Sequence, residues 1–261
     1  MSEPHSYSYS FGRFAAVQTI FWGNPTTPGH IDAGDYFMSG DRLEVDTGQE
    51  HYTEQLVRLG GQAIWYDEIH VPAAKYLGDR RKFGLEEDWV VFGCPQSSFK
   101  FHPDFDVVLA TVLRRVPNSR LVMVEGRRES WTNQLKARLR AAMPDVYDRI
   151  IFYQRLPNSD HFMIFLSVID VLLHPFPFGG SKTAADGVAL GVPFVTWPQQ
   201  YLRGRMAHSF YHSMGFTELV ATSRDDYIAK AVRLARDPVY RLRCSHAIKR
   251  LGQVIWKREE V

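Results

Sequence analysis

The segment Phe178-Gly179-Gly180-Ser181-Lys182-Thr183-Ala184-Ala185-Asp186 joins the end of an apolar strand to the start of a helix. Residues 168–175 before it are typical of a buried parallel strand, and Ala184 to Leu190 after it predict a helix that stops at Gly191. The two glycines allow a close backbone turn and leave N–H groups free at the helix start. There the Ser181 and Thr183 hydroxyls and the Lys182 ammonium can join them. The junction therefore suits a diphosphate, and a plain turn capped by Ser181 is the alternative.

The composition indicates a globular protein with a sizeable core. The chain has 261 residues, 45% of them hydrophobic, and a formal net charge of +2 from 31 basic and 29 acidic side chains. This balance favours neither nucleic acid nor an anionic membrane as a partner. Cys94 and Cys244 are its only cysteines, and the sequence contains neither a secretory leader pattern nor a stretch long enough to span a bilayer. We therefore expect a cytoplasmic or nuclear protein.

The sequence changes character near Gly84. Residues 1–84 are rich in turn-forming and aromatic residues with only short apolar runs such as Ala16 to Trp22, so they predict a fragment of a domain. Residues 85–261 instead alternate between apolar runs and helical patterns. Strands are predicted at Trp89–Gly93, Arg120–Glu125, Arg149–Tyr153, Val168–His174 and Val192–Trp197. Helices are predicted at Phe105–Val116, Ser130–Met143, Ser159–Leu166, Thr183–Leu190, Gly204–Met214, Asp225–Arg236 and Val239–Lys257.

Alternating elements of these lengths predict an α/β fold, a doubly wound parallel sheet with helices on both faces. In such a sheet, ligands bind outside the carboxyl ends of the strands. Polar residues follow three of the strands, at Cys94 to Lys100, at Leu156 to His161 and in the glycine loop. We expect these segments to surround one pocket for a nucleotide-type ligand.

Several blocks of the sequence occur in the order that is typical of one family. They are residues 95–103, 115–121, 149–152 and 157–161, the glycine loop with Thr183 and Asp186, and residues 191–196. In this order the chain resembles the C-terminal catalytic half of O-GlcNAc transferase and the related SPINDLY-type transferases. Residues 18–29, 35–36 and 52–59 resemble the last section of the family's N-terminal half, so the resemblance extends over residues 11–258.

The resemblance implies a GT-B architecture, in which two Rossmann-like halves face each other and the second holds most of the donor. Residues 1–84 would be a fragment of the N-terminal half with a linker, and residues 85–261 would be the Rossmann-like domain that binds the nucleotide sugar.

The resemblance also implies roles for individual residues. Lys100 matches a lysine that contacts the donor diphosphate and stabilises the departing UDP; a solvated surface lysine is the alternative. His161 matches a histidine that packs on uracil; the alternative is a water-exposed histidine in the first turn of a helix. Thr183 matches one of a threonine pair at the diphosphate, and Lys182 takes the place of the other. Asp186 matches the acid that binds the ribose hydroxyls; the alternative is an acid in the first turn of a helix, where the helix dipole favours a negative charge.

The sequence departs from the family pattern at several positions. Asn24 replaces a histidine of the active-site cleft, which alters acid-base capacity, and Asn158 stands where a lysine is common. Ser97 stands where a carboxamide is expected, although Gln96 is adjacent. The complete set of expected donor-binding residues is Gln96, Ser97, Pro157, Asn158, His161, Gly179, Gly180, Ser181, Lys182, Thr183 and Asp186, with Lys100 and Asn24 as the expected catalytic residues.

These matches predict a glycosyltransferase that moves GlcNAc from UDP-GlcNAc to Ser or Thr of proteins without a metal or other cofactor. The expected partners are a nucleotide sugar, a protein acceptor and a separate or missing tetratricopeptide or N-terminal half, and neither nucleic acid nor membrane. Two alternatives stay open. One is a SPINDLY-type protein O-fucosyltransferase that uses GDP-fucose, and the other is a non-catalytic subunit that binds a nucleotide sugar or supports assembly.

Overall fold

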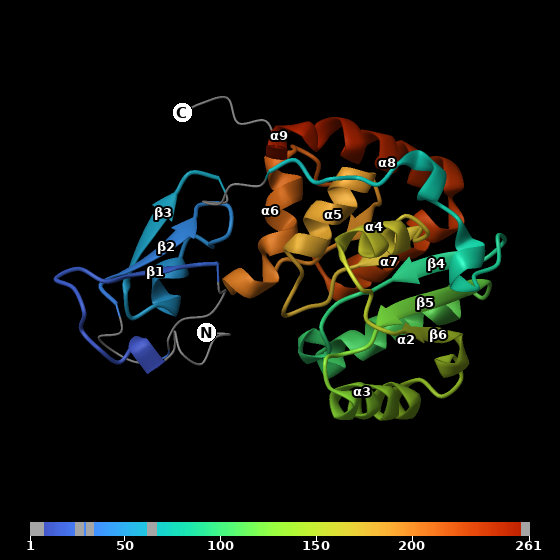
Figure 1. The fold of residues 1–261 in the computed structure, drawn as a ribbon, viewed down its shortest axis with the longest axis horizontal. Helices are drawn as coiled ribbons and strands as arrows, with labels where there is room; N and C mark the ends of the chain where they lie inside the picture. Colours follow the sequence, from blue (N-terminus) through green and yellow to red (C-terminus); the bar gives the residue numbers. More distant parts are fainter. Residues whose placement is uncertain (1–7, 24–28, 30–33, 62–66, 257–261) are drawn as a thin grey trace.

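The structure is a computed structural model that describes residues 8–23, 29, 34–61 and 67–256. It contains a three-stranded sheet in the N-terminal part and a five-stranded sheet in the remainder of the described chain (Figure 1). Asn24 lies outside the described residues.

The larger sheet has the strand order of a doubly wound fold. Its parallel strands lie in the order β6-β5-β4-β7-β8, so the chain builds one edge outward from the centre and then returns to build the other. The order reverses between β4 and β7, and folds of this kind bind ligands at the reversal. The α/β prediction is therefore confirmed, although the last two strands are shorter than their apolar runs. The strands are β4 (Val90–Gly93), β5 (Ser119–Val124), β6 (Ile150–Tyr153), β7 (Val171–Leu173) and β8 (Phe194–Val195).

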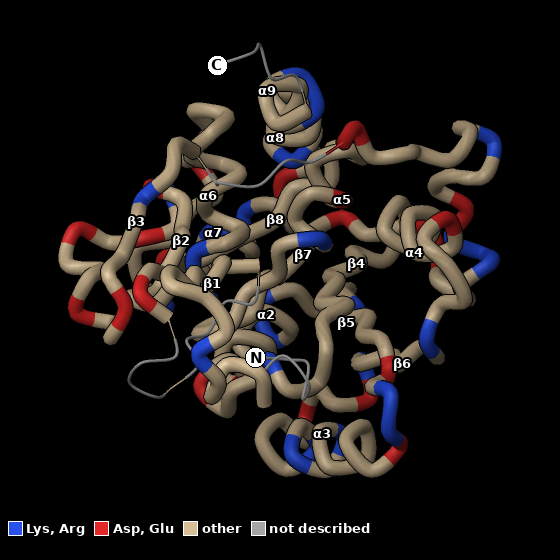
Figure 2. The backbone as a smooth tube through the Cα atoms, turned by 60° about the vertical axis from the view of Figure 1, so that its left-hand side comes forward, with Lys and Arg blue, Asp and Glu red and all other residues tan. Residues whose placement is uncertain are grey.

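Helices cover both faces of this sheet (Figures 1 and 2). Helix α2 contacts α3 and α7, α5 contacts α4, α6 and α8, and α7 and α8 contact each other. The helices are α2 (Pro103–Arg115), α3 (Glu129–Ala142), α4 (Ser159–Leu166), α5 (Lys182–Leu190), α6 (Met206–Ser213), α7 (Arg224–Arg236), α8 (Pro238–Leu251) and α9 (Gln253–Trp256). Short 3₁₀ turns lie at Gly48–His51, Ala74–Tyr76, Arg80–Phe83, Ser98–Lys100, Tyr147–Arg149 and Leu202–Gly204.

Local sequence determines several helix ends. The side chain of Asn158 caps α4, and that of Ser223 caps α7 by accepting the Asp226 N–H at 3.1 Å. Gly191 ends α5 in the left-handed conformation, at a φ of 74°.

The helix predicted over Val239–Lys257 is instead divided into α8 and α9 at Gly252. A Cβ atom at Gly252 would lie 2.4 Å from a methyl carbon of Val188 in α5. Glycine thus permits close approach of the two helices, and it is also a weak helix former.

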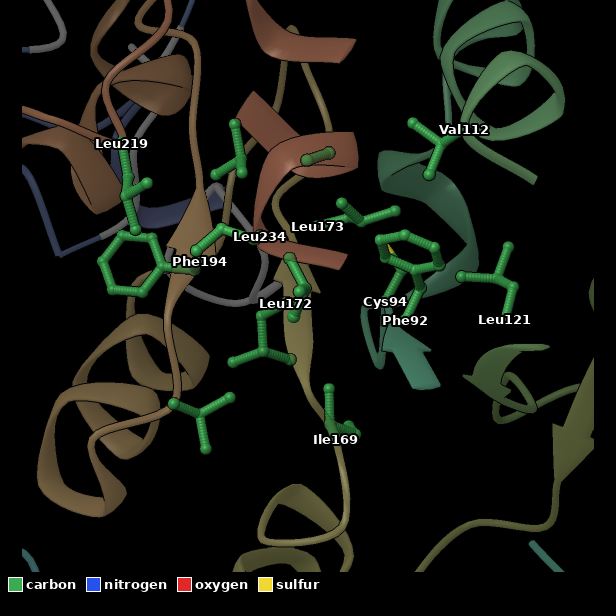
Figure 3. Packing of buried hydrophobic residues seen from close by; sticks show 14 of the residues in the cluster. Phe92, Cys94, Val112, Leu121, Ile169, Leu172, Leu173, Phe194, Leu219 and Leu234 are labelled. Atoms are coloured by element: carbon green, nitrogen blue, oxygen red, sulfur yellow. The ribbon is translucent and has the colours of Figure 1, made fainter. Parts of the chain in front are cut away.

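The core lies on both faces of the five-stranded sheet (Figure 3). Phe92, Leu121 and Phe194 from three different strands are each no more than 1% exposed. Leu172 and Leu173 are adjacent on β7 and therefore point to opposite faces, yet both are buried. Burial on both faces explains why the strands are continuous apolar runs.

The N-terminal part forms a separate parallel sheet that packs on the larger part. Its strands are β1 (Thr19–Phe21), β2 (Tyr36–Gly40) and β3 (Gln55–Leu59), in sequence order. Trp22, Phe37 and Leu43 form a hydrophobic cluster with Leu202 and Met206, which lie at and before the start of α6. Residues on either side of Gly84 therefore share a hydrophobic cluster.

Charged residues of both signs are dispersed over the molecule (Figure 2), as the small net charge predicts. None of the described helices is both long and apolar enough to cross a bilayer.

A largely buried ion pair attaches the segment between the two sheets. The guanidinium of Arg80 lies 2.7 Å from Asp170, and both side chains are 14% exposed. Asp170 also accepts the Val91 N–H at 2.8 Å, and Arg241 of α8 lies 3.4 Å from its other oxygen. This one carboxylate joins the linking segment, β4 and α8.

Replacing Asp170 with alanine should destabilise the whole fold, because two arginines and one backbone N–H lose their acceptor. We expect the free energy of unfolding in urea to fall by about 2–4 kcal/mol. Asp145→Ala is the matched control, since the Asp145 carboxylate pairs at 2.7 Å with an Arg114 side chain that is 47% exposed. The free energy of unfolding should fall much less in this variant. Equal losses for the two variants would contradict this reading.

Candidate nucleotide-sugar site

The loops that follow β4 and β7 meet where the strand order reverses. Lys100 closes the 3₁₀ turn after β4, and its Nζ donates to the Gly179 carbonyl at 3.0 Å and to Gln96 Oε1 at 3.1 Å. The structure thus brings three of the predicted site residues into contact, from segments about eighty residues apart in the sequence.

Lys100 is not the solvated surface lysine of the alternative reading. Its two acceptors are neutral, and none of the ion pairs among the described residues includes it. Burial lowers the pKa of Lys100 to about 8. The ammonium is therefore a partly buried positive charge without a counter-charge, which suits an anionic ligand.

One aromatic ring lies beside this ammonium, and a second ring packs on the first. Lys100 Nζ lies 4.8 Å from the centre of the Phe178 ring, and Phe99 meets Phe178 edge to face at 5.6 Å. Phe99 is 68% exposed, so this pair presents an apolar surface beside the charge.

The glycine loop is held closely by its neighbours. A Cβ atom on Gly180 would lie 2.5 Å from Gln96 Nε2, so a side chain there requires Gln96 to move. Gly179 N–H donates to the Arg203 carbonyl at 2.9 Å, and Gly180 N–H donates to His174 Nδ1 at 3.3 Å.

These contacts correct the expectation that the two glycines leave their N–H groups free. Both N–H groups have partners within the protein, and Ser181 makes no side-chain cap bond at the start of α5. The backbone groups at the beginning of α5, at Lys182 and Thr183, are those that lack an acceptor within the helix. The groups at this junction that can face an anion are therefore the first backbone N–H groups of α5 and the Lys100 ammonium.

Asp186 lies in the buried part of α5 rather than on its exposed side. Its side chain is 1% exposed, and one oxygen pairs with the ammonium of Lys182, which is itself 68% exposed. The other oxygen, Oδ2, is buried and has no hydrogen-bond partner among the described residues. Burial raises the pKa of Asp186, and the Lys182 ammonium opposes this shift. A buried acceptor without a donor is suited to ligand hydroxyl groups.

The predicted base-binding residues lie at the start of α4. The side-chain oxygen of Asn158 accepts the His161 N–H at 3.0 Å and lies 2.8 Å from His161 Nδ1. Asn158, His161 and Pro157 are exposed, and α4 packs against α5. The contact with Asn158 holds the His161 ring at its edge. Ser97 is also exposed, at the start of the 3₁₀ turn that carries Lys100.

A hollow of about 380 Å³ lies next to this site, and its walls include Phe176 and Pro177 from the loop after β7. The other walls are His102, Asp104, Trp197, Gln199, Ser223, Arg224 and Asp225. None of the predicted donor-binding residues lines it. Within the described parts of the chain, no three His, Cys, Asp or Glu side chains cluster as metal ligands would.

Sequence reasoning missed one residue that contacts the site. His174 was read only as the last residue of a predicted strand, although its ring accepts the N–H of Gly180. The signal was a titratable residue at the carboxyl end of a central strand, six positions before the glycine whose N–H it accepts.

Curated relatives share most of the described chain. A probable UDP-N-acetylglucosamine–peptide N-acetylglucosaminyltransferase SPINDLY of Solanum lycopersicum is 28% identical over 234 residues, which are 86% of this chain and 24% of the relative. The corresponding SEC protein of Arabidopsis thaliana is 30% identical over 230 residues, or 85% of this chain and 23% of the relative. The chain therefore spans about a quarter of the length of these relatives.

Solved structures with a similar fold are glycosyltransferases. A mutant of the Thermobaculum terrenum O-GlcNAc transferase superposes with a TM-score of 0.77 at 24% identity, covering 94% of this chain and 45% of the other. WaaG, a glycosyltransferase of lipopolysaccharide biosynthesis, gives a TM-score of 0.58 at 15% identity over 83% of this chain and 58% of its own. The likeness supports a Rossmann-like fold of the GT-B type.

The sequence profile of glycosyl transferase family 41 matches residues 62–258, which include Lys100, the start of α4 and the glycine loop. The match extends over most of the chain, and it agrees with the relatives and with the fold. The protein is therefore a member of glycosyl transferase family 41.

Proposed function

We propose that the chain binds UDP-GlcNAc and forms the donor half of a site that transfers GlcNAc to Ser or Thr hydroxyls of proteins. The observation that carries the proposal is the Lys100 ammonium, which is held between two loops by neutral acceptors at the start of α5. A diphosphate would supply the missing counter-charge.

The proposed roles follow from the contacts. Lys100 and the first turn of α5, with Lys182 and Thr183, hold the diphosphate. Asp186 accepts the ribose hydroxyls through Oδ2, which is buried and has no partner among the described residues. His161 packs on the base, with its ring edge held by Asn158.

In the proposed reaction, the acceptor hydroxyl oxygen attacks the anomeric carbon with inversion. The bond from that carbon to the diphosphate oxygen breaks, the electron pair leaves with UDP, and the proton of the acceptor hydroxyl passes to a phosphate oxygen of the departing UDP. Lys100 offers a fixed positive charge where negative charge develops, which lowers the barrier. We propose that this ammonium acts without a metal, and that the acceptor enters beside the segment containing Asn24.

Two other functions remain to be separated from this one. Protein O-fucosylation from GDP-fucose would use the same diphosphate contacts with a different base and sugar. A non-catalytic subunit would bind the nucleotide sugar only. In either case the proposed partners are a protein acceptor and a separate N-terminal or tetratricopeptide half, and the proposed location is the cytoplasm or nucleus.

Diphosphate binding should weaken as the pH rises through about 8, because Lys100 is charged below that pKa and neutral above it. UDP keeps a constant charge above about pH 7.5, since phosphate groups have a second pKa of about 6. We expect the Kd for UDP to rise about tenfold between about pH 7.5 and 9.5, which corresponds to losing one charged hydrogen bond. Calorimetric titration measures it.

Two variants make this test specific. Lys100→Met should bind UDP weakly at every pH in the window, without the pH dependence. Lys82→Met is the control, because that lysine is 49% exposed and lies in the 3₁₀ turn Arg80–Phe83, outside the proposed site, and it should keep the wild-type dependence. A flat profile for the wild type would contradict the role of Lys100.

Asp186→Asn should separate ribose binding from diphosphate binding. The substitution preserves shape but removes the negative charge, so UDP affinity should fall about tenfold while affinity for inorganic pyrophosphate stays near the wild-type value. Lys100→Met should weaken both ligands. An equal loss of affinity for UDP and for pyrophosphate in Asp186→Asn would argue against a ribose contact.

Donor identity can be decided by comparing UDP-GlcNAc with GDP-fucose. We expect calorimetry to give tighter binding of UDP and UDP-GlcNAc than of GDP and GDP-fucose, unchanged by EDTA. Glycosylation of peptides, measured with an N-terminal half supplied in trans, separates an enzyme from a binding subunit. Preference for the guanine nucleotides would favour fucosyl transfer, and binding without turnover would favour the subunit.

A further inference from the structure

His174 lies directly after β7, at the centre of the sheet, and it is held rigidly. Its side chain is 2% exposed, and its ring lies 4.8 Å from that of Phe194. Its backbone N–H donates to the Val195 carbonyl at 3.1 Å, and its own carbonyl accepts the hydroxyl of Tyr227 at 3.1 Å. The backbone of His174 is thus bonded to β8 and α7, and its ring packs on Phe194 of β8.

The contact with Gly180 determines which ring nitrogen carries the proton. Nδ1 accepts the Gly180 N–H at 3.3 Å, so Nδ1 must be unprotonated and the proton must reside on Nε2. Nε2 is buried and has no partner among the described residues. Burial, together with the Lys100 charge, lowers the pKa of His174 to about 3, so the ring stays neutral at ordinary pH.

The bond to Gly180 acts on the segment that faces Lys100. Gly179 presents its carbonyl to Lys100 at 3.0 Å, and Gly180 packs against Gln96, the other acceptor of that ammonium. Two residues later α5 begins. A shift of Gly180 therefore changes both acceptors of Lys100 and the first turn of α5.

We propose that His174 is the positioning residue of this site: its neutral imidazole holds the glycine loop so that Lys100 and the first turn of α5 face one anion. It does this through Gly180 and does not itself touch the ligand. The inference rests on the proposed function, because it assigns the structural support of the donor diphosphate site. The alternative is that His174 fills space in the core and contributes only to stability.

The loop-holding part is tested on the free protein. Nitrogen NMR of the histidines should find His174 neutral, with the proton on Nε2. His174→Leu fills the buried position with a side chain of similar size but removes the acceptor. In this variant, amide hydrogen exchange should accelerate at residues 179–183. A proton on Nδ1 in the wild type, or unchanged exchange in the variant, would overturn the proposal.

The binding part is tested with UDP and inorganic pyrophosphate. We expect His174→Leu to raise both dissociation constants about tenfold, the effect of losing well-placed hydrogen bonds to the anion. His174→Asn can offer a carboxamide oxygen to Gly180 and should regain most of this affinity. Tyr227→Phe is the matched control, since it removes one buried hydrogen bond to the His174 carbonyl and leaves Nδ1 in place.

The outcomes distinguish this inference from the proposed function. If His174→Leu binds both anions as the wild type does, or if Tyr227→Phe or His174→Asn is as weak as His174→Leu, the positioning role is wrong. If the wild type binds pyrophosphate but no nucleoside diphosphate, the donor assignment fails. The effect of His174→Leu on pyrophosphate binding then tests the positioning role by itself. Thermal unfolding of each variant shows whether a loss of affinity follows a loss of stability.

Discussion

The candidate site depends on one partly buried positive charge that neutral groups hold in place. Lys100 points its ammonium at the Gly179 carbonyl and the Gln96 side chain, and no ion pair among the described residues includes it. Burying an unpaired charge is costly, so such a lysine is seldom retained for stability alone. The same geometry creates a positive electrostatic field beside the amino end of α5, and a bound anion would relieve the cost.

The fold makes this arrangement possible through the strand order. Lys100 and the glycine loop follow β4 and β7, which are neighbours in the sheet although the loops lie about eighty residues apart in sequence. Apolar packing on both faces keeps those two strand ends in register. The absence of a side chain on Gly180 then lets the loop approach Gln96 closely, and Nδ1 of His174 accepts the Gly180 N–H. The geometry of the candidate site therefore depends on the packing of the core.

The N-terminal sheet contacts a segment that is bonded to the glycine loop. It packs on Leu202 and Met206, which lie on either side of Arg203 in the sequence, and the Arg203 carbonyl accepts the Gly179 N–H. Changes in how the N-terminal part packs can thus be transmitted to the glycine loop through a short stretch of chain.

The sequence by itself determined the class of fold, the places of most helices and strands, and the loops that carry the site. Residues 159–166, for example, were predicted as a helix and form α4 with the same bounds. These features depend on periodicity and on neighbouring residues. Tertiary structure alone decided the burial of Asp186, the engagement of both glycine N–H groups, the division of the last helix at Gly252 and the contact of His174 with Gly180. Each depends on contacts with a distant segment or on close packing between elements, and no local pattern records those distances.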